Sequence, residues 1–155
     1  MDEKRFIADS MLGRLAKWLR TMGYDTHYQP RYSHTQIEDL LAEGRVFLTR
    51  KRQWVRSFPS AIFLESDHVG EQIRELKRRG LLACGPLPFT RCIRCNSLLI
   101  EADPQVVSQH VPDYVLYESG YTIRQCPSCK RYYWPGTHRD RMERQLRLWG
   151  VSQER

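Results

Sequence analysis

Two pairs of cysteines with the same internal spacing constrain this chain more than any other feature of its sequence. The pairs are Cys92-x-x-Cys95 and Cys126-x-x-Cys129, with thirty residues between them. Each C-x-x-C motif places two sulfurs at the tip of a tight turn, and two facing tips form a tetrahedral cage that suits Zn²⁺. We therefore expect these four cysteines to bind a structural zinc ion in a zinc ribbon. Two disulfides, or a redox-active C-x-x-C, are the alternatives.

The residues beside the cysteines are polar, basic or turn-forming. Cations near a thiol lower its pKa and offset the charge of four thiolates. A four-cysteine zinc site is closed, so it would stabilise the fold and present a surface without performing chemistry. The flanking residues are Arg91, Arg94, Asn96, Pro127, Ser128 and Lys130.

The composition favours a reducing compartment and polyanionic partners. The chain has 155 residues, enough for one ordinary core or for a small core with a metal-bound appendage. No apolar run approaches the roughly 18 residues that cross a bilayer, and the charged first residues do not resemble a signal peptide. We expect a cytoplasmic protein that does not enter membranes. The 25 Lys and Arg residues outnumber the 18 Asp and Glu residues, which favours a polyanion as partner.

The first half of the chain alternates between strands and helices. Strands are predicted at residues 5–8, 24–28, 46–49 and 61–65. Helices are predicted after the first, second and fourth strands, opened by Asp9-Ser10, by the capping box Thr35-x-x-Glu38 and by Asp67, and a polar stretch follows the third strand. Strands that alternate with helices at this pitch predict a parallel α/β sheet.

Gly85, Pro86 and Pro88 mark a boundary after this region. We expect an α/β domain at residues 1–82, a linker at 83–89, a zinc ribbon at 90–136 and a closing helix at 137–155. A polar insertion would separate the two knuckles of the ribbon. The fifth cysteine, Cys84, is expected to be an inert linker thiol.

Acidic side chains stand where the predicted strands end. In an open parallel sheet, ligands bind outside the carboxyl ends of the strands. Asp9 follows the first strand, Thr49-Arg50-Lys51 follows the third, and Glu65-Ser66-Asp67 follows the fourth. Carboxylates that converge there would bind Mg²⁺ or Mn²⁺ and activate water against a phosphodiester. Helix capping is the structural alternative for both Asp9 and Asp67.

Basic residues gather in several clusters, and aromatic residues lie beside three of them. Phosphate contacts combined with base stacking are typical of RNA binding. Each cluster alone would be a solvated face, so it is their recurrence that indicates a nucleic acid. The clusters are Arg50-Lys51-Arg52 with Arg56, Lys77-Arg78-Arg79, Arg91 with Arg94, Lys130-Arg131, and Arg139, Arg141, Arg144 and Arg147; the aromatic residues are Trp54, Tyr132, Tyr133 and Trp134.

A series of longer motifs runs in order along nearly the whole chain. In the first half they are Phe6-Ile7-Ala8-Asp9, the nine residues from Leu12 to Arg20, Gly23-Tyr24-Asp25, and Arg45-Val46-Phe47-Leu48-Thr49-Arg50. In the second half they are Phe89-Thr90-Arg91-Cys92, Cys95-Asn96, the second cysteine pair, and Tyr133-Trp134-Pro135-Gly136-Thr137-His138. On these motifs the chain resembles the Mut7-C ribonuclease family, a PIN-like domain followed by a zinc ribbon. The resemblance implies a PIN-like nuclease fold, RNA as substrate, and acids at the strand ends that act through a divalent metal ion.

The sequence departs from the family pattern at two places that concern catalysis. Lys51 stands where the family has an Asp after Leu-Thr-Arg. Before the second helix the chain reads Ser33-His34-Thr35-Gln36, so Glu38 or Asp39 would have to serve as the acid, one turn late. The Lys51 ammonium beside the two remaining acids, Asp9 and Asp67, would weaken Mg²⁺ binding. In place of a metal ion, Lys51 would neutralise these acids or hold an RNA phosphate.

The aromatic stretch after the second cysteine pair has two interpretations. We favour packing of Trp134 over the thiolates of the ribbon, with His138 in the first turn of the closing helix. In the alternative, Trp134 and His138 contact RNA.

Three functions remain open at this point. The first is a metal-dependent endoribonuclease, with Asp9 and Asp67 as ligands of Mg²⁺ or Mn²⁺ and Glu38 or Asp39 as third acid. The second is a degenerate PIN-like protein that binds RNA or a ribonucleoprotein without cutting it. The third is an adaptor that docks a protein on its zinc ribbon. The residues expected on RNA are Arg14, Arg20, Arg50, Lys51, Arg52, Arg91, Arg94, Lys130, Arg131, Trp134 and His138.

Overall fold

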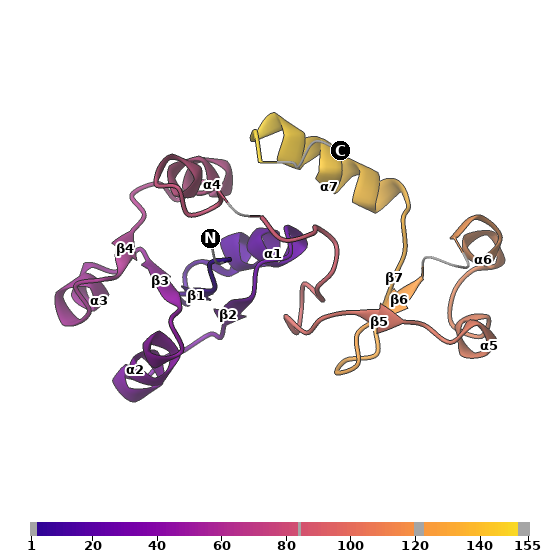
Figure 1. The fold of residues 1–155 in the computed structure, drawn as a ribbon, viewed down its shortest axis with the longest axis horizontal. Helices are drawn as coiled ribbons and strands as arrows, with labels where there is room; N and C mark the ends of the chain where they lie inside the picture. Colours follow the sequence, from indigo (N-terminus) through magenta and orange to yellow (C-terminus); the bar gives the residue numbers. More distant parts are fainter. Residues whose placement is uncertain (1–2, 84, 120–122, 152–155) are drawn as a thin grey trace.

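A computed structural model describes residues 3–83, 85–119 and 123–151, so Cys84 lies outside the described residues. The first half is an α/β unit and the second half a smaller β-sheet unit with short helices (Figure 1). The elements of the first half are β1 (Phe6–Ala8), α1 (Gly13–Thr21), β2 (Thr26–Tyr28), α2 (His34–Ala42), β3 (Val46–Thr49), α3 (Arg52–Ser57), β4 (Ile62–Phe63) and α4 (Val69–Arg78). Those of the second half are β5 (Ile100–Glu101), α5 (Pro104–Val107), α6 (Asp113–Ser119), β6 (Arg124–Gln125), β7 (Tyr132–Tyr133) and α7 (Thr137–Leu148).

The first four strands form one parallel sheet in the order β2-β1-β3-β4, which confirms the predicted α/β class. Phe6 pairs with Thr26 on one side and with Val46 on the other. The central strand β1 is buried throughout. Helices cover both faces of the sheet, which is why β1 and β3 are nearly continuous apolar runs.

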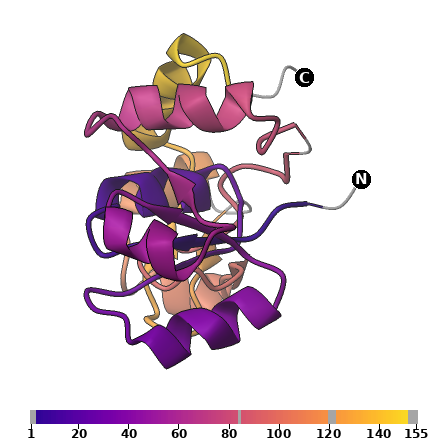
Figure 2. The same ribbon diagram turned by 90° about the vertical axis from the view of Figure 1, so that its left-hand side faces the viewer.

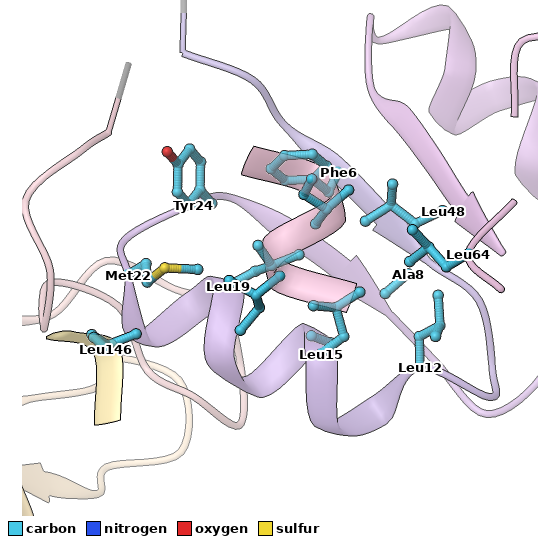
Figure 3. Packing of buried hydrophobic residues seen from close by; sticks show 13 residues of the cluster. Phe6, Ala8, Leu12, Leu15, Leu19, Met22, Tyr24, Leu48, Leu64 and Leu146 are labelled. Atoms are coloured by element: carbon cyan, nitrogen blue, oxygen red, sulfur yellow. The ribbon is translucent and has the colours of Figure 1, made fainter. Parts of the chain in front are cut away.

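Alternation along the strands divides the apolar side chains between two cores. Phe6, Ala8 and Leu48 face α1 and α4 in the larger core (Figure 3). Ile7 and Phe47 face the opposite side, where α2 and α3 cover them. In Figures 1 and 2, α2 accordingly lies on the side of the sheet opposite α4 and α7. At the carboxyl edge of the sheet lie polar side chains that follow or end the central strands, among them Asp9 and Thr49.

The closing helix α7 returns to the first unit. Leu146 belongs to the larger core, close to Met22 in Figure 3. The Trp149 ring meets the Trp18 ring edge-on at 4.8 Å between centroids. Gly70 makes room for this ring, because a Cβ on Gly70 would lie 2.6 Å from the Trp149 indole nitrogen. The two ends of the chain therefore share one core.

The second half contains a three-stranded antiparallel sheet in the order β5-β6-β7. The segment between the cysteine pairs was predicted to be a polar insertion, but it forms α5 and α6 and has an apolar core of its own. That core consists of Val107, Val111, Val115 and Ile123, with Trp134 packed against it. Asp103 caps α5 by accepting a hydrogen bond from the Gln105 amide, and Pro104 occupies its first turn.

Several local predictions need correction. The capping box of α2 uses Ser33 and Gln36, not Thr35 and Glu38. Neither Asp9 nor Asp67 caps a helix, since α1 and α4 begin after Leu12 and His68 without a side-chain cap. Helix α3 was not predicted, because its six residues are too few for an apolar period to appear. None of the described helices combines the length and apolar character needed to span a membrane.

Candidate functional site

The four cysteines converge on one point between the two halves of the ribbon. Their ligand atoms all lie within 4.8 Å of one another, and the sulfurs of Cys92 and Cys129 are 3.7 Å apart. A Zn–S distance of about 2.3 Å in a tetrahedron separates the sulfurs by about 3.8 Å. All four are free thiols in the structure, with no disulfide among them. The cluster is a candidate metal site.

The two knuckles repeat the same backbone pattern. The amide of the first cysteine donates to the carbonyl five residues later, from Cys92 to Ser97 and from Cys126 to Arg131. The residue after the second cysteine, Asn96 or Lys130, adopts a φ of 68°. This left-handed residue turns the chain back so that both sulfurs point inward.

Burial, amide groups and neighbouring thiols determine how easily Cys126 and Cys95 ionise. Burial raises the pKa of Cys126, but hydrogen bonds from the amides of Cys129 and Ser128 and from the neighbouring thiols outweigh it and lower this pKa to about 7. Burial and the nearby Cys129 and Cys92 raise the pKa of Cys95 to about 12. Four thiolates at this spacing repel one another, so a bound cation is what would let all of them ionise together.

Tyr133 is the aromatic residue that touches the thiols. Its hydroxyl lies 3.1 Å from the Cys92 sulfur and accepts a hydrogen bond from the Ile93 amide at 3.3 Å. Burial, and then Cys92, raise the pKa of this phenol. The favoured sequence interpretation gave that place to Trp134, which instead packs on the core between α5 and α6. Tyr133 thus holds the Cys92 thiol in place, as hydrogen-bonded neighbours of metal ligands do.

The first knuckle is joined to the α/β unit through Asn96. Its side-chain oxygen accepts from the Thr26 amide at 2.9 Å, and its side-chain nitrogen donates to the Asp25 carboxylate at 2.7 Å. Asp25 also accepts from Arg45 at 2.8 Å. Burial raises the pKa of Asp25, but these bonds from Arg45 and Asn96 outweigh it and hold the pKa below its ordinary value.

Two arginines complete this junction. Arg20 is buried and donates to the carbonyls of Thr26, Ile93 and Arg94 at 3.0 to 3.2 Å. Arg91 donates to the carbonyls of Gly23 and Asn96. Both arginines were expected on RNA, and the structure places both between the two units.

Asp9 lies at the carboxyl edge of the sheet, where the sequence analysis expected it. It is 1% exposed and accepts from the Ser10 amide at 2.6 Å and from the Thr49 hydroxyl at 2.8 Å. The Lys51 ammonium lies 3.2 Å from the Ser10 hydroxyl, which itself lies 3.3 Å from Asp9. The Ser10 hydroxyl therefore bridges the Lys51 ammonium and the Asp9 carboxylate. The Thr49 hydroxyl accepts a hydrogen bond from the Lys51 backbone amide.

The other predicted acids are not held at this edge. The Asp67 side chain is 73% exposed, with His68 3.6 Å away. Glu38 is 57% exposed and pairs with His34 at 2.7 Å, and Asp39 is exposed on the same helix. Within the described residues, the four cysteines are the one group of three or more potential ligands whose atoms lie close enough to share a metal ion.

The remaining predicted RNA residues divide by location. Arg14 opens α1 near the carboxyl edge and is exposed. Arg50 donates to the carbonyls of Leu64 and Glu65, and Arg52 lies over the Phe63 ring at 4.3 Å. The others are exposed on the knuckles and at the start of α7; they are Arg94, Lys130, Arg131 and His138.

Sequence reasoning missed Thr49, Ser10, Tyr133 and Asn96 as site residues. The position of Asn96 directly after a C-x-x-C pair is a usable signal, because Asn is among the residues that tolerate a left-handed conformation. The contacts of the other three cross between elements and have no local signature.

The comparisons with known proteins agree with this architecture. The model of the Mut7-C RNAse domain family matches residues 4–146. A search of curated proteins and a search of solved structures found no match. The match extends over the α/β unit, the cysteine pairs and most of α7. The chain therefore belongs to the Mut7-C RNAse domain family.

Proposed function

We propose that this protein binds single-stranded RNA along the carboxyl edge of its parallel sheet and cleaves it slowly or not at all. The observation that carries this proposal is that Asp9 has an ammonium group nearby and, within the described residues, no second carboxylate held beside it. Asp9 is buried and bonded to the Thr49 hydroxyl, with the Lys51 ammonium one hydroxyl away. A divalent ion in such a site would need further carboxylates. Asp67 and Glu38 are directed to solvent and to histidines instead.

The charges of the same edge suit a phosphodiester chain. Lys51 lies one hydroxyl from Asp9, Arg14 is in the first turn of α1 and Arg52 is the first residue of α3, and both helices begin after strands that end at this edge. The net charge of +7 adds a general attraction for polyanions. Membership of an RNase domain family supports RNA as the polyanion.

A structural Zn²⁺ ion is part of the proposal. The donor set of four thiols, the 3.7 Å sulfur separation and the amide bonds to sulfur fit zinc. When bound, zinc would neutralise the thiolates and hold the two knuckles together. The first knuckle would then be fixed against the α/β unit by the hydrogen bonds of Asn96, Arg20 and Arg91. We therefore assign the two arginines to the junction and not to RNA.

The second candidate function is a metal-dependent endoribonuclease, which the family match favours. In that function Asp9 would bind Mg²⁺ or Mn²⁺ together with Asp67 and Glu38 or Asp39. A third candidate, docking of a protein or ribonucleoprotein on the ribbon, rests on the exposed apolar residues Leu98, Ile100 and Tyr114.

Salt-dependent RNA binding separates the adaptor from the other two candidates. If about five phosphates are engaged, the affinity for a single-stranded oligoribonucleotide should fall about a hundredfold between about 50 and 200 mM salt. Fluorescence anisotropy with zinc-loaded protein measures this directly. An affinity that does not change across this range would remove RNA from the proposal and favour the adaptor.

A further inference from the structure

Three side chains from three neighbouring strands form one row at the carboxyl edge of the sheet. Thr49 ends β3 and is the direct ladder partner of Phe63, the last residue of β4. On its other side Thr49 donates to Asp9. Ile62, Ala8 and Leu48 all face the larger core on the side of α1. Because side chains alternate along a strand, the residues that follow them, Phe63, Asp9 and Thr49, face the opposite side, where α2 and α3 lie. With strands about 4.8 Å apart, Phe63 lies about 10 Å from Asp9 along the row.

A small hollow lies at the Phe63 end of this row. It has a volume of about 230 Å³ and is lined by Arg52, Val55, Arg56 and Phe63. Arg52 and Arg56 are four residues apart on α3 and so lie on one side of it. Because β4 is the last strand in the sheet order, the hollow opens at the free edge of the sheet.

The two guanidinium groups of the hollow differ from that of Arg50. Arg50 is engaged by two backbone carbonyls of the β4 end. Arg52 and Arg56 are exposed, and neither side chain makes a hydrogen bond or ion pair with any residue in the described part of the chain. The Arg52 guanidinium carbon lies over the Phe63 ring, 4.3 Å from the ring centroid, and Arg52 is exposed, so the side of this group away from Phe63 is accessible to a ligand.

We infer that Arg52, Arg56 and Phe63 form a nucleotide subsite for single-stranded RNA, which rests on the proposed function. A base stacks on the accessible side of the Arg52 guanidinium, while the Phe63 ring behind it holds this group in place. Arg56, one turn further along α3, binds a neighbouring phosphate. The subsite places an RNA strand along the row that leads to Thr49 and Asp9, beside the Lys51 ammonium.

The test measures RNA affinity with zinc-loaded, full-length protein and a short fluorescein-labelled oligouridylate, without added Mg²⁺ or Mn²⁺ so that the RNA stays intact. Arg52→Lys keeps the charge but removes the stacking plane, and it should weaken binding about tenfold with little change in salt dependence. Arg56→Ala should reduce the slope of log affinity against log salt by about 0.7. Arg78→Lys and Arg78→Ala are the matched controls, since Arg78 is exposed on α4 at the opposite face of the sheet.

Photo-crosslinking of halouridine RNA gives an independent readout, with the adduct expected on α3, the helix that carries Arg52 and Arg56. If native protein binds RNA but the Arg52 and Arg78 variants lose affinity equally, the subsite is wrong and the proposed function stands. If native protein shows no salt-dependent RNA binding, the proposed function fails, and the subsite fails with it.

Discussion

Replacing Asn96 with Gly isolates the contribution of the junction between the zinc ribbon and the α/β unit. Asn96 and Lys130 occupy equivalent positions in the two knuckles and share a φ of 68°. Lys130→Gly therefore makes the same backbone change without touching the junction, because within the described residues the Lys130 side chain hydrogen-bonds only to the Pro127 carbonyl of its own knuckle. The difference between the two variants reports the side chain of Asn96.

The expected magnitudes follow from the contacts that each variant loses. In both variants glycine removes about 1 kcal/mol of strain from the left-handed backbone of the folded state. Glycine also makes the unfolded chain more flexible, which lowers the free energy of unfolding by about 0.4–1 kcal/mol. Lys130→Gly should thus change the free energy of unfolding by less than about 1 kcal/mol. Asn96→Gly leaves the buried Thr26 amide without its acceptor, at about 1–3 kcal/mol, and removes a donor to the Asp25 carboxylate. Allowing for water at this half-buried site, we expect a loss of about 2–4 kcal/mol.

Urea unfolding of both variants with excess zinc, followed by circular dichroism, measures these free energies. Hydrogen exchange at the Thr26 amide should also accelerate in Asn96→Gly and stay unchanged in Lys130→Gly. Equal unfolding midpoints for the two variants, with Thr26 equally protected, would refute the proposed junction.

Two further predictions concern the metal site and the junction carboxylate. Purified protein should carry about one equivalent of zinc, and Cys126→Ser should lose it together with the ordered ribbon, because the site contributes folding energy only when all its ligands bind; elemental analysis without zinc, or disulfides in mass spectra, would contradict this. The depressed pKa of Asp25 stabilises the fold above the pKa of an unfolded Asp, about 3.9, and this contribution is lost as pH falls through the native pKa. The stability difference between native protein and Asp25→Asn should therefore shrink as pH falls from about 5 to about 3, and a difference that does not vary with pH would exclude the carboxylate as its source.

The sequence was sufficient to predict the features that depend on short spacings. The C-x-x-C pairs predicted the thiol cluster, and the apolar runs Phe6–Ala8 and Val46–Thr49 predicted the central strands of a parallel sheet. The alternation of strands and helices also predicted that Asp9 ends a strand. In each case the structure depends on contacts within one element or on a rule about strand ends.

The features that sequence reasoning missed depend on contacts between distant elements. Arg20 was expected on RNA, yet it follows Ala16 by one helical turn on the buried side of α1, a position that indicates the interior. Helices α5 and α6 were missed because they are too short for an apolar period to appear, although Asp103 and Pro104 mark the start of a helix. That α7 packs on Trp18 and Gly70 could not be predicted, because the periodicity of a helix shows which face is buried but not its partner.

A calorimetric titration of Mn²⁺ into native protein and Lys51→Asp, paired with RNA cleavage assays of both and of Asp9→Asn, shows whether Lys51 replaces a metal ion beside Asp9. The Lys51 ammonium near Asp9 supplies the charge that a metal ion would bring, so native protein should bind Mn²⁺ weakly and cut RNA slowly or not at all. Lys51→Asp should bind Mn²⁺ more tightly, since it removes a positive charge and adds a carboxylate beside Asp9. Brisk Mn²⁺-dependent cleavage by the native protein, abolished in Asp9→Asn, would contradict the account and establish the endoribonuclease instead.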